Sequence, residues 1–357
     1  MERVTNLQFS NCVMGDGVLY GFLDDGGYPI EIDLQTKEVS VADLDKGLQT
    51  SIHVDSLLYN DQMIYILELD GRCLIQYNIR DKQLKYYSIH YKGGTWGNFA
   101  FFTQMQQSIY IFPKRADCLI EIDLQNERVE KKAMQLHNAQ DVRFSCAFRN
   151  ENEVCLFDED AQKIWIYDLR KKIFRQGVME QEIECLATAA VFKDKAYLLG
   201  EKGSVYLCRL ADYSIDEIRR SRVENVNFEW GNIAATEKNI WLLPALGESI
   251  CIINRENFEE RVFTEYPNDF EYANIEGYSK FYGYGEDEGK YYFAPRLANY
   301  MLEIDKNSGS GEWIKLINPL KKDLYDAIQK NLGIINEGPY NALDLKDFLS
   351  LICNKPI

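Results

Sequence analysis

Short hydrophobic runs alternate with polar positions along the whole chain, and many of these runs end at an Asp or Asn. In residues 119–124, Leu-Ile-Glu-Ile-Asp-Leu, apolar and polar side chains alternate up to the Asp. Such an alternation predicts β-strands with one face buried. A second hydrophobic run, such as residues 109–111, precedes each of these segments. Turn-forming residues such as Asp70-Gly71 separate the two runs, so each pair is predicted to form a β-hairpin.

The same hydrophobic segment occurs seven times at a nearly constant period. The fifth residue of each copy, called its anchor here, is Asp33, Asn78, Asp123, Asp168, Arg209, Asn254 or Asp305. Successive anchors are 45, 45, 45, 41, 45 and 51 residues apart. A fixed period of this size indicates a repeat architecture. Polar residues and a weaker hydrophobic run, such as residues 39–41 or 313–314, follow each anchor, so each repeat is predicted to contain four strands.

Four antiparallel strands per repeat match one blade of a β-propeller. We therefore predict an all-β fold, a seven-bladed β-propeller of four-stranded blades over residues 1–316. Closing the repeats into a ring shelters strand edges that would otherwise promote aggregation. An open solenoid is the alternative, but solenoid repeats usually carry helices or much shorter β-coils.

The anchor segments resemble those of kelch-like propellers of the galactose-oxidase type. The shared feature is a hydrophobic strand that ends in Asp or Asn after a glycine-containing turn, and the resemblance covers residues 5–316. The paired glycine of kelch repeats is found at Gly26-Gly27, and the WD dipeptide of the other large propeller class is missing. The resemblance implies a propeller that binds a partner and carries over no catalytic residue.

The period of the pattern changes after Trp313, and residues 317–357 are predicted to form a helical extension. Asn318 and Pro319 are suited to begin a helix, and Asp344 to begin a second one. The residues that fall on the apolar sides of these helices are Leu320, Leu324, Ala327, Ile328, Leu345, Phe348, Leu349 and Ile352. We expect the extension to pack on the propeller as a plug or cap. The alternative is a docking element for a partner protein.

Composition excludes several classes of partner. The 40 basic and 56 acidic residues give a net charge of −16, which repels nucleic-acid backbones and anionic lipids, and no basic patch offsets it. No apolar run long enough to span a membrane is present, and residues 1–8 do not resemble a secretion signal. Nine cysteines show no CxxC spacing and are expected to be buried, reduced thiols. We expect a cytoplasmic protein of a bacterium, with no nucleic acid or membrane as a partner.

The innermost strand of each blade precedes the hairpin, and several of these strands are predicted to open with an aromatic residue followed by a small one. The expected starts are Phe9-Ser10-Asn11, Trp96-Gly97-Asn98, Phe144-Ser145-Cys146, Trp230-Gly231-Asn232 and Tyr278-Ser279-Lys280, with the second blade near Val54-Asp55-Ser56. Trp-Gly-Asn occurs twice, in blades three and six. A glycine beside a bulky ring suits backbones that crowd the axis, so packing alone explains the motif. The alternative is that Asn98 and Asn232 also contact a ligand.

Turns between the second and third strands lie on the same face as the starts of the inner strands, because alternate strands run in opposite directions. Pro113-Lys114-Arg115 and Pro295-Arg296 are two such turns that carry cations. This face is our candidate binding surface, with the tryptophans as stacking surfaces and the cations as anion or sugar contacts. The predicted ligand-binding residues are Trp96, Asn98, Arg115, Trp230, Asn232, Lys280 and Arg296.

Signatures of catalysis are sparse. The three histidines, His53, His90 and His137, show no metal-ligand spacing, and Gly283-Tyr284-Gly285 lacks the third glycine of a dinucleotide site. We therefore predict no metal and no cofactor. A carboxylate at the mouth of the channel, such as Asp55, is left open as a catalytic group.

Three interpretations of function follow. The first is a non-catalytic binding or scaffold propeller that uses the face at the starts of the inner strands for a peptide, protein or carbohydrate-like partner. The second is an enzyme, a lyase or hydrolase, with its site in the central channel. A carboxylate, a Lys and a Tyr or His converging in one pocket would favour it. The third is a structural partner of another enzyme that docks through residues 317–357.

Overall fold

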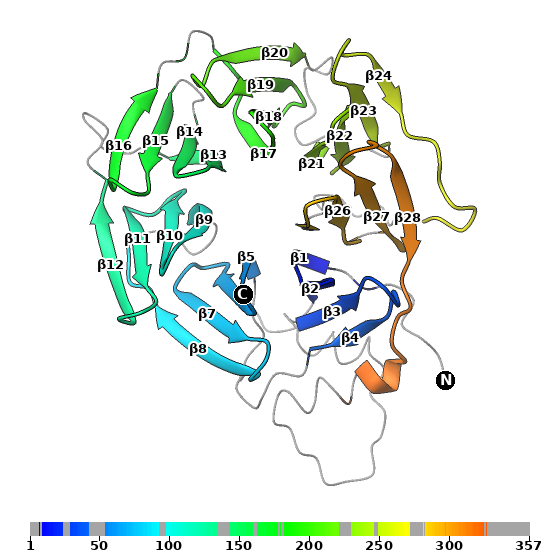
Figure 1. Cartoon of the computed structure of the whole chain (residues 1–357), viewed down its shortest axis with the longest axis horizontal. Coiled ribbons are helices and arrows are strands. Elements are labelled where there is room, and N and C mark those ends of the chain that lie inside the picture. Colours follow the sequence, from blue (N-terminus) through cyan, green and yellow to red (C-terminus); the bar gives the residue numbers. More distant parts are fainter. Residues whose placement is uncertain are drawn as a thin grey trace, which may run out of the picture.

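Seven four-stranded antiparallel sheets stand in a ring in the computed structural model, which confirms the seven-bladed β-propeller (Figure 1). Each sheet is built from four consecutive strands in the order of the chain. The structure describes residues 7, 9–23, 29–42, 54–92, 98–134, 143–159, 163–177, 179, 182–220, 230–245, 249–271, 281, 283–296, 298–324 and 326.

The strands occupy four positions from the axis outward. The innermost are β1 (Phe9–Gly15), β5 (Val54–Asn60), β9 (Phe99–Met105), β13 (Phe144–Asn150), β17 (Leu186–Phe192), β21 (Trp230–Ala235) and β25 (Tyr284–Glu286). The second are β2 (Val18–Leu23), β6 (Met63–Glu68), β10 (Ser108–Pro113), β14 (Glu153–Asp158), β18 (Lys195–Gly200), β22 (Asn239–Pro244) and β26 (Lys290–Phe293). The third are β3 (Pro29–Asp33), β7 (Cys73–Asn78), β11 (Cys118–Asp123), β15 (Ile164–Asp168), β19 (Val205–Arg209), β23 (Cys251–Asn254) and β27 (Tyr300–Asp305). The outermost are β4 (Val39–Val41), β8 (Gln83–Ser88), β12 (Arg128–Ala133), β16 (Ile173–Gly177), β20 (Ile215–Arg219), β24 (Glu260–Val262) and β28 (Gly311–Lys315).

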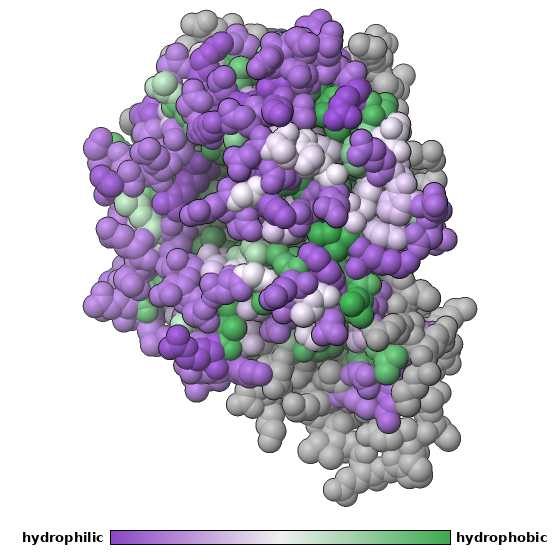
Figure 2. All heavy atoms as spheres, turned by 45° about the vertical axis from the view of Figure 1, so that its right-hand side comes forward, coloured by the Kyte–Doolittle hydropathy of each residue, from purple (hydrophilic) through white to green (hydrophobic). Residues whose placement is uncertain are grey.

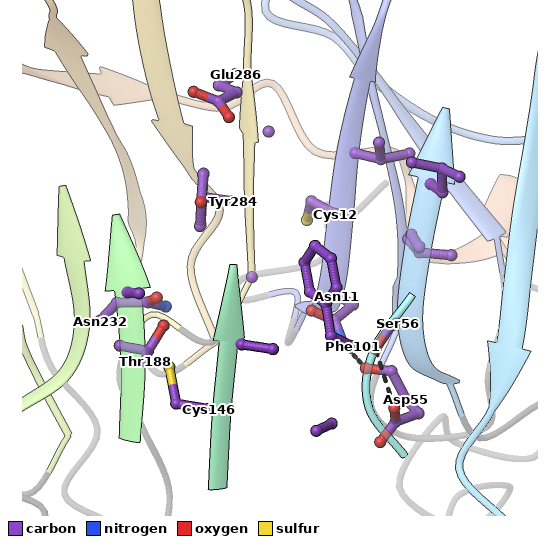
Figure 3. Close-up of a pocket in the computed structure, with 18 of the residues that line it drawn as sticks. Asn11, Cys12, Asp55, Ser56, Phe101, Cys146, Thr188, Asn232, Tyr284 and Glu286 are labelled. Atoms are coloured by element: carbon purple, nitrogen blue, oxygen red, sulfur yellow. Dashed lines mark hydrogen bonds between the residues drawn. The ribbon is translucent and has the colours of Figure 1, made fainter. Parts of the chain in front are cut away.

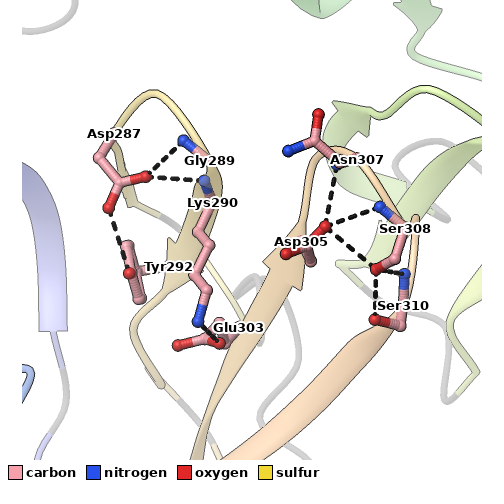
Figure 4. A network of polar contacts seen from close by, with 9 residues as sticks. All are labelled: Asp287, Gly289, Lys290, Tyr292, Glu303, Asp305, Asn307, Ser308 and Ser310. Atoms are coloured by element: carbon pink, nitrogen blue, oxygen red, sulfur yellow. Dashed lines mark hydrogen bonds and ion pairs between the residues drawn. The ribbon is translucent and has the colours of Figure 1, made fainter.

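Each anchor ends the third strand, and the six anchors that are Asp or Asn shape the turn to the outermost strand. At Asp305 the Oδ1 atom accepts hydrogen bonds from the backbone N–H groups of Asn307 at 2.9 Å and Ser308 at 2.7 Å (Figure 4). The same pair of bonds forms at Asp33, Asn78, Asp123, Asp168 and Asn254. The fourth residue after each anchor has a positive φ, as at Gly309 with 71°. The repeated Asp or Asn is therefore explained by turn chemistry.

The core of the protein lies between the blades. The buried hydrophobic residues form seven clusters, and each cluster joins two neighbouring blades. Alternate side chains of one strand serve the two sides of a blade: Ile109 and Ile111 of β10 pack toward the second blade, whereas Tyr110 and Phe112 pack toward the fourth. This arrangement follows from the two-residue period of a strand and explains why strands such as β10 are apolar on both faces.

The seventh cluster closes the ring between the first and last blades. It contains Phe9 and Ile30 of the first blade and Met301 of the last one. Because every sheet consists of consecutive strands, neither of these blades borrows a strand from the other end of the chain. The backbone N–H of Phe9 instead donates to the carbonyl oxygen of Pro295 at 3.1 Å.

The segment after the last strand reinforces this junction. Ile317 pairs in parallel with the first blade: its N–H donates to Lys37 O at 2.8 Å, and its carbonyl oxygen accepts from Val39 N at 3.0 Å. Residues 321–324 then form a short helix, and Leu324, at 2 % exposure, joins the cluster between the first and last blades. The predicted second helix, with Phe348 and Ile352, and also Ile328 lie outside the described residues.

The outer surface is mostly hydrophilic, with hydrophobic atoms in small separate areas on the side that Figure 2 shows. The large hydrophobic side chains that are exposed among the described residues are Tyr86, Ile173, Phe258, Val262 and Ile317. Apart from Phe258 and Val262 in the sixth blade, they belong to different parts of the ring. The described outer strands therefore present no extended apolar surface for a partner.

Replacing Asp305 by Ala is expected to lower the free energy of unfolding by about 1 kcal/mol, because two backbone N–H groups lose their acceptor. Asp305→Asn is expected to stay close to the parent protein, since Asn78 and Asn254 serve the same purpose in other blades. Urea denaturation of the two variants checks this. An Asn variant as unstable as the Ala variant would show that charge, and not the turn acceptor, is needed.

Leu324→Ala is expected to destabilise the protein by about 2 to 4 kcal/mol, because it empties a buried position in the cluster that closes the ring. Ile317→Ala is the matched control. The Ile317 side chain is 42 % exposed and its pairing uses backbone atoms, so we expect a loss below about 1 kcal/mol. Chemical unfolding curves of both variants distinguish the two effects, and equal losses would contradict the proposed closure.

Candidate functional site

The innermost strands surround a cavity of about 570 Å³ on the ring axis, and all seven blades line it. Figure 3 shows Asn11, Ser56, Cys146, Thr188 and Asn232 facing one another from different strands. Alanines and glycines occupy many of the remaining wall positions. A wall of small side chains leaves room for a ligand where bulky ones would fill the axis.

A β-bulge at the start of the inner strand widens the set of residues that reach the cavity. In the second blade, Val54 pairs with Glu68 and Ser56 pairs with Leu67, so Asp55 is the extra residue. Equivalent register shifts occur in each of the first six blades. A bulge re-aims a side chain that a regular strand would send to the opposite face. Asp55 and Ser56, although adjacent, therefore both line the cavity.

The two Trp-Gly-Asn motifs are not equivalent, contrary to the expectation from their sequence. Trp230 is the first residue of β21 and pairs with Pro244, but the residue that pairs with Pro113 in the third blade is Phe99. Trp96 therefore precedes the start of the strand by three positions. The repeated letters suggested the wrong register, whereas counting back from the tight turn of the hairpin would have identified Phe99.

The two asparagines of these motifs have different surroundings. Asn232 lines the cavity, and its side-chain amide donates to the carbonyl oxygen of Phe281 in the next blade at 3.1 Å. Asn98 is 1 % exposed, does not line the cavity, and donates to Asp70 O of the preceding blade at 3.1 Å. Both amides thus link neighbouring blades.

Trp230 belongs to the core between the fifth and sixth blades. It is 5 % exposed, and the Arg219 guanidinium lies 6.0 Å from its ring centroid. Trp96 and Lys280 lie outside the described residues. Among the described wall residues, the aromatic side chains are Tyr59, Phe101 and Tyr284.

Two predicted cations lie on turns at the face where the inner strands start. Arg115 is exposed and Arg296 is partly exposed. The carbonyl oxygen of Asn98 accepts backbone hydrogen bonds from Lys114 at 2.7 Å, from Arg115 at 2.9 Å and from Ala116 at 3.2 Å. The carbonyl oxygen of Asn98 thus holds the turn that carries Lys114 and Arg115.

Asp55 is the acidic residue that the bulge of β5 places in the cavity wall. Ser56 Oγ donates to its Oδ2 at 2.9 Å, and the Asn11 amide donates to its backbone carbonyl oxygen (Figure 3). Burial raises the pKa of Asp55 from 3.8 to about 6, although the Ser56 hydrogen bond and the charge of Lys114 act in the opposite direction. The sequence analysis named Asp55 as an open possibility, and the structure places it in the wall.

The other carboxylate of the wall lies at the far end of the channel. Figure 3 shows Glu286 and Asp55 at opposite ends, with Tyr284 between Glu286 and the centre. Glu286 accepts a hydrogen bond from Lys306 Nζ at 2.7 Å, and burial raises the pKa of Tyr284. These two carboxylates therefore do not form a close pair around one reacting atom, as glycoside hydrolysis requires.

The thiols and the described histidine offer little chemistry. Eight cysteines are described and all are free thiols. Burial raises the pKa of Cys146 in the wall to about 12, so its thiol stays protonated at neutral pH. His90 is exposed and does not line the cavity. In the described ranges, no three His, Cys, Asp or Glu residues are grouped as a metal site requires.

Comparison with solved structures shows the fold alone. PorZ, a bacterial surface component of the type-IX secretion system of Porphyromonas gingivalis, matches 90% of this chain at 12% identity with a TM-score of 0.59. This chain spans only 39% of PorZ. The computationally designed protein Ika8 matches over 88% of this chain and 98% of its own, with 11% identity and a TM-score of 0.53.

YCF48, whose structure contains a bound D1 peptide, covers 83% of this chain and 92% of its own, with 9% identity and a TM-score of 0.59. No protein-family model and no curated protein sequence matches the chain. In the described part of the chain, no helix has the length and apolar character needed to cross a membrane.

Asp55→Asn is expected to stabilise the protein at pH 7.5. The pKa of Asp55 is raised in the folded state, so the folded protein binds this proton more tightly than the unfolded chain does. The ionised carboxylate therefore lowers stability above about pH 6, and this penalty disappears as the pH falls toward about 4. We expect a gain on the order of 2 kcal/mol at pH 7.5 and almost none at pH 4. Thermal unfolding at the two pH values measures it.

Asp61→Asn, on the exposed turn at the other end of the same strand, is the control and is expected to change stability little at either pH. An Asp55→Asn variant that is less stable than the parent at pH 7.5 would mean that the carboxylate is well satisfied in the folded protein.

Proposed function

We propose that this propeller is a non-catalytic binding or scaffold protein that holds a partner at the face where the inner strands begin. The observation that carries the proposal is the cavity on the axis, which all seven blades line. The turn that carries Lys114 and Arg115 follows β10 at the face where the inner strands begin. Binding sites typically combine apolar surface with a few placed polar groups in a concave setting. Among the described residues, the outer surface, by contrast, offers only a few exposed hydrophobic side chains.

The class of partner that we propose is a peptide or a segment of a protein, with a carbohydrate-like ligand as the alternative. YCF48 has been solved with a bound peptide, and we extend peptide binding to this chain as part of the proposal. Arg115 and Arg296 on the rim, and Asn232 in the wall, supply charge and polar contacts at the face. Trp96 and Lys280 remain predicted contributors. The kelch-like type, the bacterial source and the cytoplasmic location also remain part of the proposal.

An enzyme with its site in the channel is the second candidate function. The observation in its favour is the raised pKa of Asp55 near the positive charge of Lys114, because such a carboxylate can exchange protons near neutral pH. Tyr284 lies toward the far end of the channel, beside Glu286 (Figure 3). The carboxylate, lysine and tyrosine that a lyase or hydrolase would use are thus spread along the channel.

Replacing Arg115 and Arg296 together by Ala is expected to weaken binding of the partner about tenfold or more, because arginines at interfaces often contribute strongly. The partner is first identified by mass spectrometry of what co-purifies with the native protein, and its affinity is then measured for each variant. Thermal stability is expected to change little, since neither side chain is buried.

The matched control replaces Arg80 and Arg170, which lie on exposed turns between the third and outermost strands, at the opposite face. This double variant removes the same charge and is expected to bind normally. Normal binding by the Arg115 and Arg296 variant, together with loss of binding by the control, would place the functional surface on the opposite face.

A further inference from the structure

The cavity contains a negative charge that no described side chain neutralises by direct contact. Asp55 makes no ion pair with any of the residues that the structure describes, and its carboxylate accepts a hydrogen bond from the Ser56 hydroxyl. The positive charge of Lys114 offsets only part of the rise in the pKa of Asp55 that burial causes. A half-buried carboxylate with so little compensation favours a ligand that brings its own positive charge.

The wall around Asp55 suits an unbranched hydrocarbon stem better than a sugar. Leu57, Ala100, Phe101 and Ala147 lie along the wall of the same cavity. One N–H of each of the Asn11 and Asn232 amides already donates to a carbonyl oxygen of a neighbouring blade, which leaves fewer groups for the hydroxyls of a sugar. A ligand with a long apolar stem and one cationic end matches both features.

The existing hydrogen bond of Asp55 favours a compact ammonium group over a planar guanidinium group as its ligand. Its Oδ2 atom already accepts from Ser56 Oγ at 2.9 Å. A guanidinium in a bidentate pair would have to share Oδ2 with Ser56, whereas an ammonium can bind Oδ1 alone. The geometry therefore favours a lysine-like ammonium over an arginine.

We propose that the channel receives the side chain of a lysine from the bound peptide or protein, with its ammonium at Asp55 and its stem against Leu57, Phe101 and Ala147. This inference rests on the proposed binding function and names the group that the mouth of the channel recognises. Lys114 and Arg115 on the rim would then contact the partner outside the channel.

The test compares two small probes on the full chain: Nα-acetyl-lysine N-methylamide and its norleucine counterpart, which has a similar stem without the ammonium. Ligand-observed NMR is expected to show binding of the lysine probe with a dissociation constant of about 1 to 10 mM, as single side-chain ligands bind weakly. The norleucine probe is expected to bind at least about fivefold more weakly.

Asp55→Asn is expected to abolish the preference for lysine, and Asp61→Asn to preserve it. Thermal unfolding confirms that both variants are folded. Equal binding of the two probes by the parent, an unchanged preference in Asp55→Asn, or no binding of the lysine probe at about 10 mM would overturn the inference.

The same variants separate this inference from the proposed function. The co-purified partner could bind the Asp55→Asn variant normally and fail to bind the Arg115 and Arg296 double variant. This result would support the proposed binding face and contradict the lysine site. If no partner co-purifies while the lysine preference is found, the binding face lacks support and the lysine site stands.

Discussion

Packing of apolar side chains between neighbouring blades is the interaction on which the rest of the structure depends. Each blade is a thin sheet that exposes both faces until another blade covers it, so a single blade has no core of its own. Seven junctions bury the alternating side chains of all the inner strands. The ring also forces the inner strands together, and the cavity on the axis is the space that remains between them.

The sequence predicted the blades because their signals are local. An anchor such as Asp305 bonds to backbone groups two and three residues ahead, so its identity repeats wherever that turn repeats. The interior of the channel could not be predicted in the same way. Which side chains reach it depends on the bulges, and a bulge is a property of the pairing between two strands. Trp96 and Asn98 illustrate the problem, since the register places them before the strand that was expected to contain them.

The environment of Asp55 was equally inaccessible from sequence, because its raised pKa depends on burial by other blades. A carboxylate whose negative charge has few partners in the folded state reduces stability. Asp55 therefore differs from the aspartate anchors, whose carboxylates accept hydrogen bonds from the backbone. Burial raises the pKa of Asp55 despite the hydrogen bond from Ser56, whereas the hydrogen bond from the Ser308 N–H lowers the pKa of Asp305. The same residue type thus fills a structural position and a candidate functional one, and only the three-dimensional surroundings distinguish them.

The manner of ring closure bears on how the protein is made. Each sheet is formed from consecutive residues, so a blade contains all of its strands as soon as its own stretch of chain has been synthesised. Six junctions join blades that are also neighbours along the chain, but the seventh joins the first blade to the last one and includes Leu324. During synthesis, blades can therefore stack in the order of the chain, and the first blade keeps an open apolar side until the last blade has been made. Until that junction forms, the uncovered side of the first blade is the surface of the growing chain most exposed to aggregation.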